Sequence, residues 1–238
     1  ASTHVSKVTK IFDTIPSQLQ KHEKKFMLKA LTEGARMRDY ETAFFWLSDA
    51  MIVNMAYNTT EPNIGLGMNT DDTTLKCYMS DTGLLISHAF NEKAIVSESL
   101  YNKLLTDKLE FNSGMVIENI VAQMLRSAGH NLFFFSKYSK EAEDRMEIDF
   151  LIAKDTITTK HNISPIEVKS TNRYTLTSLK KSIAKYGIYL STPYECDDSG
   201  GSHRSAEISE PSAAGSFLLW RSFLFLSFFL WDILFFIF

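Results

Sequence analysis

The spacing of hydrophobic residues in the first ninety positions predicts short helices followed by two strands. Apolar side chains recur every three or four residues between positions 5 and 31, which predicts two or three helices, the second beginning at Pro16. A further helix places Ala43, Trp46, Leu47 and Ala50 on one face. Residues 52–57 and 75–79 are rich in β-branched and aromatic side chains, as strands are. Helices followed by a β-hairpin favour a winged helix-turn-helix domain over residues 1–90.

The pattern changes in the second half of the chain to alternating helices and strands. Asp81 is placed to cap one helix, residues 92–109 have a variable helical pattern, and an amphipathic helix follows from residue 114 until Gly129 ends it. Apolar runs at residues 131–136, 147–153 and 163–169 predict three strands, and residues 176–186 predict a last helix. This order predicts an α/β fold class, with an α/β core in residues 91–193.

Residues 194–238 differ in composition from everything before them. Residues 199–216 are rich in Ser, Gly, Ala and Glu, as linkers are, and the last 22 residues hold 8 of the 18 Phe. The apolar run from Phe217 has the ~20 residues that cross a bilayer, but it carries Arg221 and Asp232, each of which costs ~3 kcal/mol near the membrane centre. We therefore expect a cytoplasmic protein whose tail is a non-native, frame-shifted segment. A membrane anchor is the alternative if the tail is genuine.

Charge and cysteine content exclude several classes of protein. The formal charge of −3 is the sum of +1 over residues 1–186 and −4 over the rest, so a nucleic-acid contact needs a local basic patch. Cys77 and Cys196 have no partner at metal-ligand spacing, and the six His are scattered, which argues against a zinc site. No phosphate-binding G-x-x-x-x-G-K-[ST] loop occurs, so we expect no ATP site in this chain.

Four charged residues in the second half have the types and positions that phosphodiester hydrolysis needs. Glu118 lies in the helix that begins near residue 114, Asp149 in the second strand of the core, and Glu167 and Lys169 in the third. Because strand side chains alternate, Glu167 and Lys169 point to the same face. Oxygen ligands suit Mg²⁺, which offsets phosphate charge and acidifies a bound water. Each residue alone is more readily a solvated surface charge, but charges inside apolar strands are costly to bury unless they are paired or metal-bound.

The amino-acid sequence around these residues resembles that of known families. Asp149 followed by Glu167-Val168-Lys169 is similar to the PD-(D/E)xK nuclease superfamily, with Glu118 in the place of its helix-borne acid. The segments KVTKIFDTIPSQL, CYMSDTGLL, GMVIENIVAQML, EIDFLI, SPIEVKS and RYTLTSLKKSIAKY together resemble the C-terminal region of a family of prokaryotic AAA-type ATPases. That resemblance implies a winged helix, then a restriction-endonuclease-like domain, with an ATPase module upstream or in trans. Met51 occupies a position at which this resemblance implies a turn-forming Gly.

Together these features favour a DNA-associated protein with a PD-(D/E)xK-like domain. In this hypothesis Asp149 and Glu167 bind Mg²⁺, Glu118 supports the metal, and Lys169 positions or activates water. Basic residues on the two predicted domains are the candidate contacts to nucleic acid: Lys24, Lys25, Arg36, Arg38, Arg173, Lys180 and Lys181. The alternative is a non-catalytic DNA- or partner-binding C-terminal module of an AAA-type ATPase, in which the same residues are relics.

Overall fold

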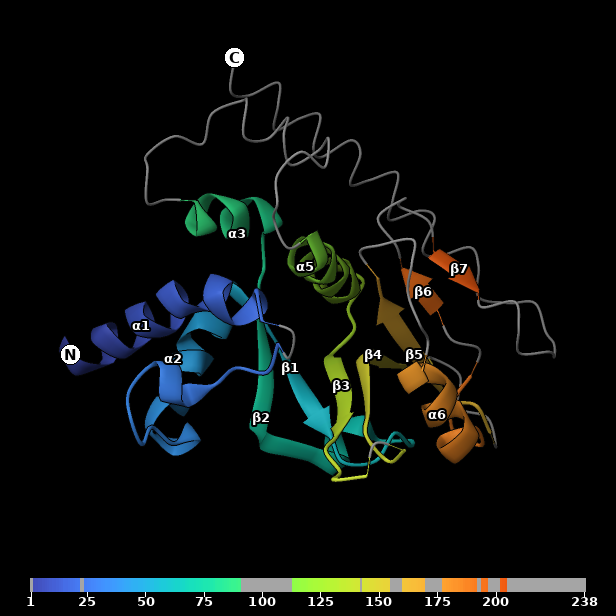
Figure 1. The fold of residues 1–238 in the computed structure, drawn as a ribbon. Helices are drawn as coiled ribbons and strands as arrows, with labels where there is room; N and C mark the ends of the chain where they lie inside the picture. The colour runs from blue at the N-terminus through green and yellow to red at the C-terminus, as the bar shows by residue number, and fades with distance from the viewer. Residues whose placement is uncertain are drawn as a thin grey trace, which may run out of the picture. The chain divides into compact units, whose positions relative to one another are not determined.

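A seven-stranded sheet forms the centre of the structure, a computed structural model, with strand order β2-β1-β3-β4-β5-β6-β7 (Figure 1). Strand β1 pairs with β3 in parallel, and β5 pairs with β6 in parallel. The other neighbouring strands pair antiparallel. Their bounds are β1 (Val53–Thr59), β2 (Thr70–Met79), β3 (Leu132–Lys137), β4 (Met146–Ala153), β5 (Ile163–Val168), β6 (Tyr194–Cys196) and β7 (Ser202–Arg204). The fold is therefore mixed α/β, in agreement with the predicted class.

The structure describes residues 2–21, 24–90, 113–141, 143–154, 160–169, 177–191, 194–196 and 202–204. The helical pattern at residues 92–109 and the apolar run at 217–238 lie outside the described residues. No helix within the described ranges has the length and apolar character to cross a membrane.

The two strands predicted in the first ninety residues do form an antiparallel pair. Val53 lies opposite Met79, and the register shifts between Tyr57 and Asn58. The other edge of β1 pairs in parallel with β3, Ala56 lying opposite Leu132. The hairpin is thus part of the same sheet as the strands of the second half.

Five α-helices and two 3₁₀ turns are described around the sheet. They are α1 (Ser2–Leu19), α2 (Met37–Asp49), α3 (Thr82–Ala89), α5 (Ser113–Ser127), α6 (Thr177–Tyr186), η1 (Leu28–Ala30) and η2 (Leu66–Asn69). Two predicted helix ends are confirmed. The Asp81 carboxylate accepts a hydrogen bond of 2.6 Å from the Leu84 N–H at the start of α3, and Gly129 adopts φ +88° after α5.

The prediction that Pro16 begins a second helix is wrong, because Pro16 lies inside α1. A proline has no N–H to donate to the carbonyl four residues earlier, here that of Phe12. The Phe12 carbonyl instead lies 3.2 Å from the His88 Nε2 of α3. The helix continues past the proline, since the Gln20 N–H donates to the Pro16 carbonyl at 3.0 Å.

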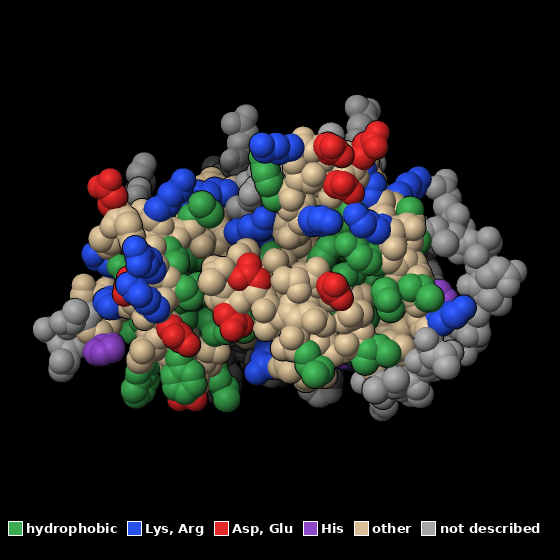
Figure 2. Space-filling model, turned by 90° about the horizontal axis from the view of Figure 1, so that it is seen from below, with side chains coloured by type: hydrophobic (Ala, Val, Ile, Leu, Met, Phe, Trp, Pro, Cys, Tyr) green, Lys and Arg blue, Asp and Glu red, His purple; other side chains and the backbone are tan. Residues whose placement is uncertain are grey.

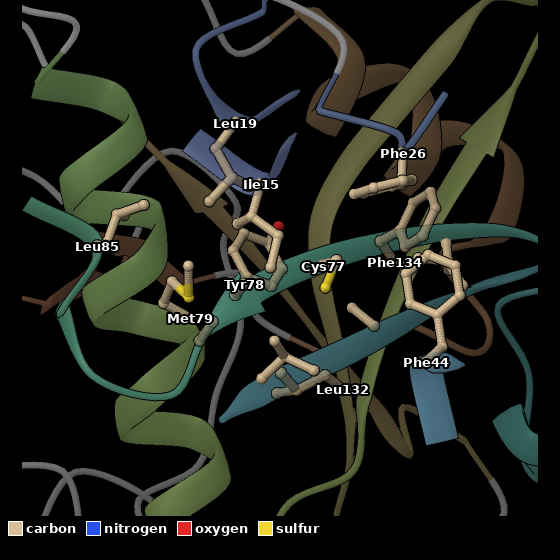
Figure 3. Close-up of a cluster of buried hydrophobic side chains, with 14 of the residues drawn as sticks. Ile15, Leu19, Phe26, Phe44, Cys77, Tyr78, Met79, Leu85, Leu132 and Phe134 are labelled. Carbon is tan, nitrogen blue, oxygen red and sulfur yellow. The ribbon is translucent and has the colours of Figure 1, made fainter. Parts of the chain in front are cut away.

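The main hydrophobic core joins α1, α2 and α5 to the sheet, and at β2 it includes Cys77, Tyr78 and Met79, whose side chains alternate between the two faces. Figure 3 shows part of it, in which Ile15 and Leu19 of α1 lie beside Tyr78 of β2. At β3 a smaller cluster lies on the face opposite Phe134, where Ile183 and Tyr186 of α6 pack on Phe135 and Ile148. Helices on both faces therefore bury the central strands.

The buried stripe of α2 differs from the predicted one. Tyr40, Ala43, Phe44 and Leu47 are buried, whereas the Trp46 side chain is 58% exposed. Both stripes have helical spacing and differ by a small rotation of the helix, so the spacing alone did not distinguish them.

Met51 joins α2 to β1 with a left-handed backbone, φ +56°, and its side chain is 82% exposed. A non-glycine residue in this conformation is strained by about 1 kcal/mol. We expect Met51→Gly to raise the free energy of unfolding by about 0.5 kcal/mol, after the greater entropy of glycine in the unfolded chain is subtracted. Urea denaturation measures this change in the free energy of unfolding.

Met68 is the control, because it is also exposed, at 89%, and is not among the residues with positive φ. Met68→Gly should destabilise, and an equal loss from both variants would contradict the strain argument.

Candidate active site

A buried lysine stands at the centre of the charged residues that the fold brings together. The Lys76 side chain, on β2, is 1% exposed, and its Nζ lies 3.2 Å from Glu118 Oε1, 3.2 Å from Glu147 Oε1 and 3.4 Å from Asp149 Oδ1. The ammonium also lies 5.1 Å from the centre of the Phe134 ring. We call Lys24, Lys76, Glu118, Glu147, Asp149, Glu167 and Lys169 the charged cluster.

Glu118 is the most completely paired carboxylate of the charged cluster. Its Oε1 accepts from the Tyr78 hydroxyl at 2.5 Å as well as from Lys76, and its Oε2 pairs with the Lys24 ammonium. The next residue of α5 fixes its place, because the Asn119 side chain accepts from the Met79 N–H at 2.9 Å and donates to the Met79 carbonyl at 3.1 Å. Glu118 therefore holds α5 and the segment after α1 against β2.

Asp149, Glu167 and Lys169 form the second part of the charged cluster, at β4 and the end of β5. Asp149 Oδ2 accepts from the Val168 N–H at 3.0 Å, which ties the two strands together beside the acid. Glu167 Oε1 accepts from the Lys169 ammonium at 2.5 Å. Glu167 Oε2 is buried and accepts no hydrogen bond from any described residue. One buried carboxylate oxygen is therefore left without a donor, next to a lysine that is 25% exposed.

Burial and neighbouring charge move the pKa values of these carboxyls in opposite directions. Burial alone would raise the pKa of Glu118, but Lys76 and Lys24 outweigh it and hold that pKa at about 2. Burial and then the charge of Asp149 raise the pKa of Glu167 to about 7. Burial and the charge of Glu118 also raise the pKa of Asp149. The same cluster thus contains a firmly ionised acid and a pair of acids that resist holding two negative charges.

The donor set decides whether a divalent cation fits here. Within the described ranges, no group of three or more His, Cys, Asp and Glu side chains is arranged to hold a metal ion. Mg²⁺ is commonly held by one or two carboxylates, with waters and substrate phosphate completing its shell. Asp149 and Glu167 meet that smaller requirement, since they lie on the paired strands β4 and β5 and Glu167 Oε2 accepts no hydrogen bond from any described residue. The Glu118 oxygens are already engaged by Lys24, Lys76 and Tyr78.

The residues predicted to contact nucleic acid are dispersed over several elements. The Lys24 ammonium pairs with Glu118, and Lys25 beside it is half-buried. Arg36 and Arg38 are exposed at the start of α2, where Arg38 lies 3.8 Å from Asp39. Lys180 and Lys181 lie on α6, and Lys181 donates to the Arg145 carbonyl at 3.5 Å. Arg173 lies outside the described residues. The face in Figure 2 carries Lys and Arg side chains over much of its upper half, with acidic side chains among them.

Three members of the site were missed from the sequence: Lys76, Tyr78 and Glu147. The available signal was the run Leu75-Lys76-Cys77-Tyr78-Met79, in which a lysine interrupts a strand that is otherwise apolar. A charge in such a strand is costly to bury unless it is paired, which is the argument that singled out Asp149 and Glu167. Applied to Lys76, it would have predicted a buried acidic partner.

Comparison with known proteins divides the chain into two regions. Residues 1–94 match a domain of unknown function (DUF8612), and residues 113–196 match another domain of unknown function (DUF4143). No curated protein and no solved structure matches the chain. The charged cluster draws on both regions, since Lys24 and Lys76 come from the first and its carboxylates from the second.

Proposed function

We propose that this chain is a DNA-associated protein that hydrolyses phosphodiester bonds with a divalent cation such as Mg²⁺. In this proposal residues 91–193 form a PD-(D/E)xK-like α/β domain and residues 1–90 a winged-helix-like domain. The observation that carries it is the Glu167 carboxylate, which is buried with one oxygen on Lys169 and the other free of any described donor. Such an oxygen is costly to bury unless a cation or a proton meets it.

The side chains have separate tasks in this reaction. Asp149 and Glu167 would hold the cation, which supplies charge to the phosphate and acidifies a bound water. The Val168 N–H orients Asp149, and Glu167 orients the Lys169 ammonium. Lys169 is the more exposed member of its pair, so its positive charge can reach the scissile phosphate or hold the attacking water.

Basic side chains outside the charged cluster would bind the DNA backbone. Arg36 and Arg38 at the start of α2 and Lys180 of α6 are exposed, and Lys181 of α6 is half-buried. Contacts of this kind depend on phosphate charge and carry no sequence information. We therefore expect binding that weakens steeply with salt.

A second candidate function is a non-catalytic DNA- or partner-binding module of an AAA-type ATPase. DUF4143 is commonly a C-terminal domain in AAA-ATPase-associated proteins, which supports this candidate. So do Phe45 and Trp46, large apolar side chains of α2 that are 61% and 58% exposed. In this case the charged cluster serves to hold the fold together.

Cleavage of plasmid DNA by the full chain separates the two candidates. With Mg²⁺ or Mn²⁺ we expect wild-type cleavage that EDTA stops and that Asp149→Ala and Lys169→Ala abolish. Lys185→Ala is the matched control, because Lys185 pairs with Asp144 at the surface, outside the charged cluster. It should cleave as the wild type does. Equal cleavage by wild type, Asp149→Ala and Lys169→Ala would refute the hydrolytic function, and DNA retention without cleavage would favour the binding module.

A further inference from the structure

We propose that the Lys76 ammonium occupies the place of a second cation, so that the site takes one divalent cation and not two. This inference rests on the proposed function, because the one cation is that of Asp149 and Glu167. Many phosphodiester-cleaving sites hold two metal ions between shared carboxylates. Here a side chain of β2 provides the second positive charge permanently.

The surroundings of Lys76 are those of a cation position. Its Nζ is within 3.4 Å of oxygens from three carboxylates, one on α5 and two on β4. Glu118 and Asp149 are shared, since Glu118 also binds Lys24 and Asp149 also accepts from Val168. A cluster of acids that meet at one point would repel one another without a central cation.

Lys76 cannot easily leave this place. It lies in a strand between the buried residues Leu75 and Cys77, its side chain is 1% exposed, and its ammonium faces the Phe134 ring at 5.1 Å. A divalent cation cannot occupy the point between Glu118, Glu147 and Asp149 while the ammonium fills it, because the two charges would repel at contact distance. A second cation would therefore have to displace a buried lysine from three acids.

The charge of the cluster supports the same conclusion. It contains four carboxylates, those of Glu118, Glu147, Asp149 and Glu167, and three ammonium groups, those of Lys24, Lys76 and Lys169. One divalent cation turns this single negative excess into a single positive one, which suits a phosphate. A second would leave a strong positive excess in a buried site, at a high electrostatic cost.

Counting bound Mn²⁺ on the full chain by calorimetry and by electron paramagnetic resonance tests the proposal. We expect one ion per wild-type chain and two per Lys76→Ala chain, since the variant opens a space lined by three carboxylates. Lys24→Ala is the matched control, because it removes another ammonium from Glu118 and leaves Lys76 in place. It should bind one ion. Two ions on the wild type, or no additional ion on Lys76→Ala, would overturn the proposal.

The result also separates this inference from the proposed function. No ion on the wild type would refute the function, whereas one ion gained by Lys76→Ala would still support the cation position of Lys76. If Lys76→Ala is unfolded without metal, circular dichroism during Mn²⁺ addition decides. Recovery of the fold with the additional ion supports the proposal, and failure to recover at saturating Mn²⁺ overturns it.

Discussion

Replacing Glu118 with Gln is expected to lower the free energy of unfolding by about 3 kcal/mol at pH 7, the largest loss of stability among the substitutions considered. The reason is that a neutral amide at this position would leave the buried Lys76 and the partly buried Lys24 without the carboxylate that both contact. Urea denaturation at pH 7 measures the change. Glu147→Gln is the matched control, since Glu147 is as close to Lys76 at 3.2 Å but is 29% exposed. Because Glu147 is partly exposed and the buried Lys76 keeps Glu118 and Asp149 as partners, the loss of Glu147 should cost less than about 1 kcal/mol. Equal losses from both variants would contradict the central role of Glu118.

The same substitution should change how stability depends on pH. The pKa of Glu118 is about 2 in the folded protein, below its ordinary value of 4.5. Its stabilisation is therefore fully present above pH 4.5 and is lost as the pH falls toward 2. Wild type and Glu118→Gln should approach each other in stability over that interval. A constant difference between them from pH 7 to pH 3 would mean that the carboxylate charge is not the cause.

Glu167→Gln is expected to abolish at least about 99% of the cleavage activity while making the protein more stable at alkaline pH. Burial and Asp149 raise the pKa of Glu167 from 4.5 to about 7, so the cost of ionising it grows between pH 4.5 and pH 7 and is fully present above pH 7. A neutral amide removes that cost, and we expect a gain of about 2 kcal/mol at pH 8. Below pH 4.5 the acid is protonated in both the folded and unfolded states, so the gain should vanish there. Plasmid cleavage and urea denaturation at pH 8 and pH 4 measure the two effects.

Lys169→Ala is the control for this pair of effects. It removes the partner of Glu167 and leaves the carboxyl in place, so it should lose activity without the alkaline gain in stability. Full activity of Glu167→Gln would contradict the proposed role of Glu167 in binding the cation. A loss of stability at pH 8 would contradict the argument from its raised pKa.

The local part of the fold and the antiparallel pairing of β1 with β2 could be predicted from the sequence, and the pairing of the other strands could not. Strand β4 is found within one residue of its predicted range, and β5 begins at Ile163 as predicted. β2 begins at Thr70, five residues before its predicted start. Its first residues are polar and not buried, so they lack the apolar pattern of a strand, but they still pair with β1. Period and composition describe a strand, but they carry no information on its neighbour.

The same limit explains what was missed in the site. Asp149 and Glu167 are recognisable because each interrupts an apolar strand and lies near the other in sequence. Lys76 of β2 meets Asp149 of β4 across 73 positions, and β1 and β3 lie between their strands in the sheet. No spacing rule connects residues over that distance. Lys24 was predicted to contact phosphate because its neighbours in sequence are basic. Its actual partner, Glu118, is 94 positions away in the sequence.

Strand β1 connects the two matched sequence regions, because it pairs with a strand of each. One edge of β1 belongs to β2 and the other to β3, so the regions at residues 1–94 and 113–196 share a row of backbone hydrogen bonds. If the first region were removed, β3 would become an open edge rich in phenylalanine, from Leu132 to Phe135, and such edges recruit other chains. The two matched regions of sequence therefore contribute strands to one continuous sheet.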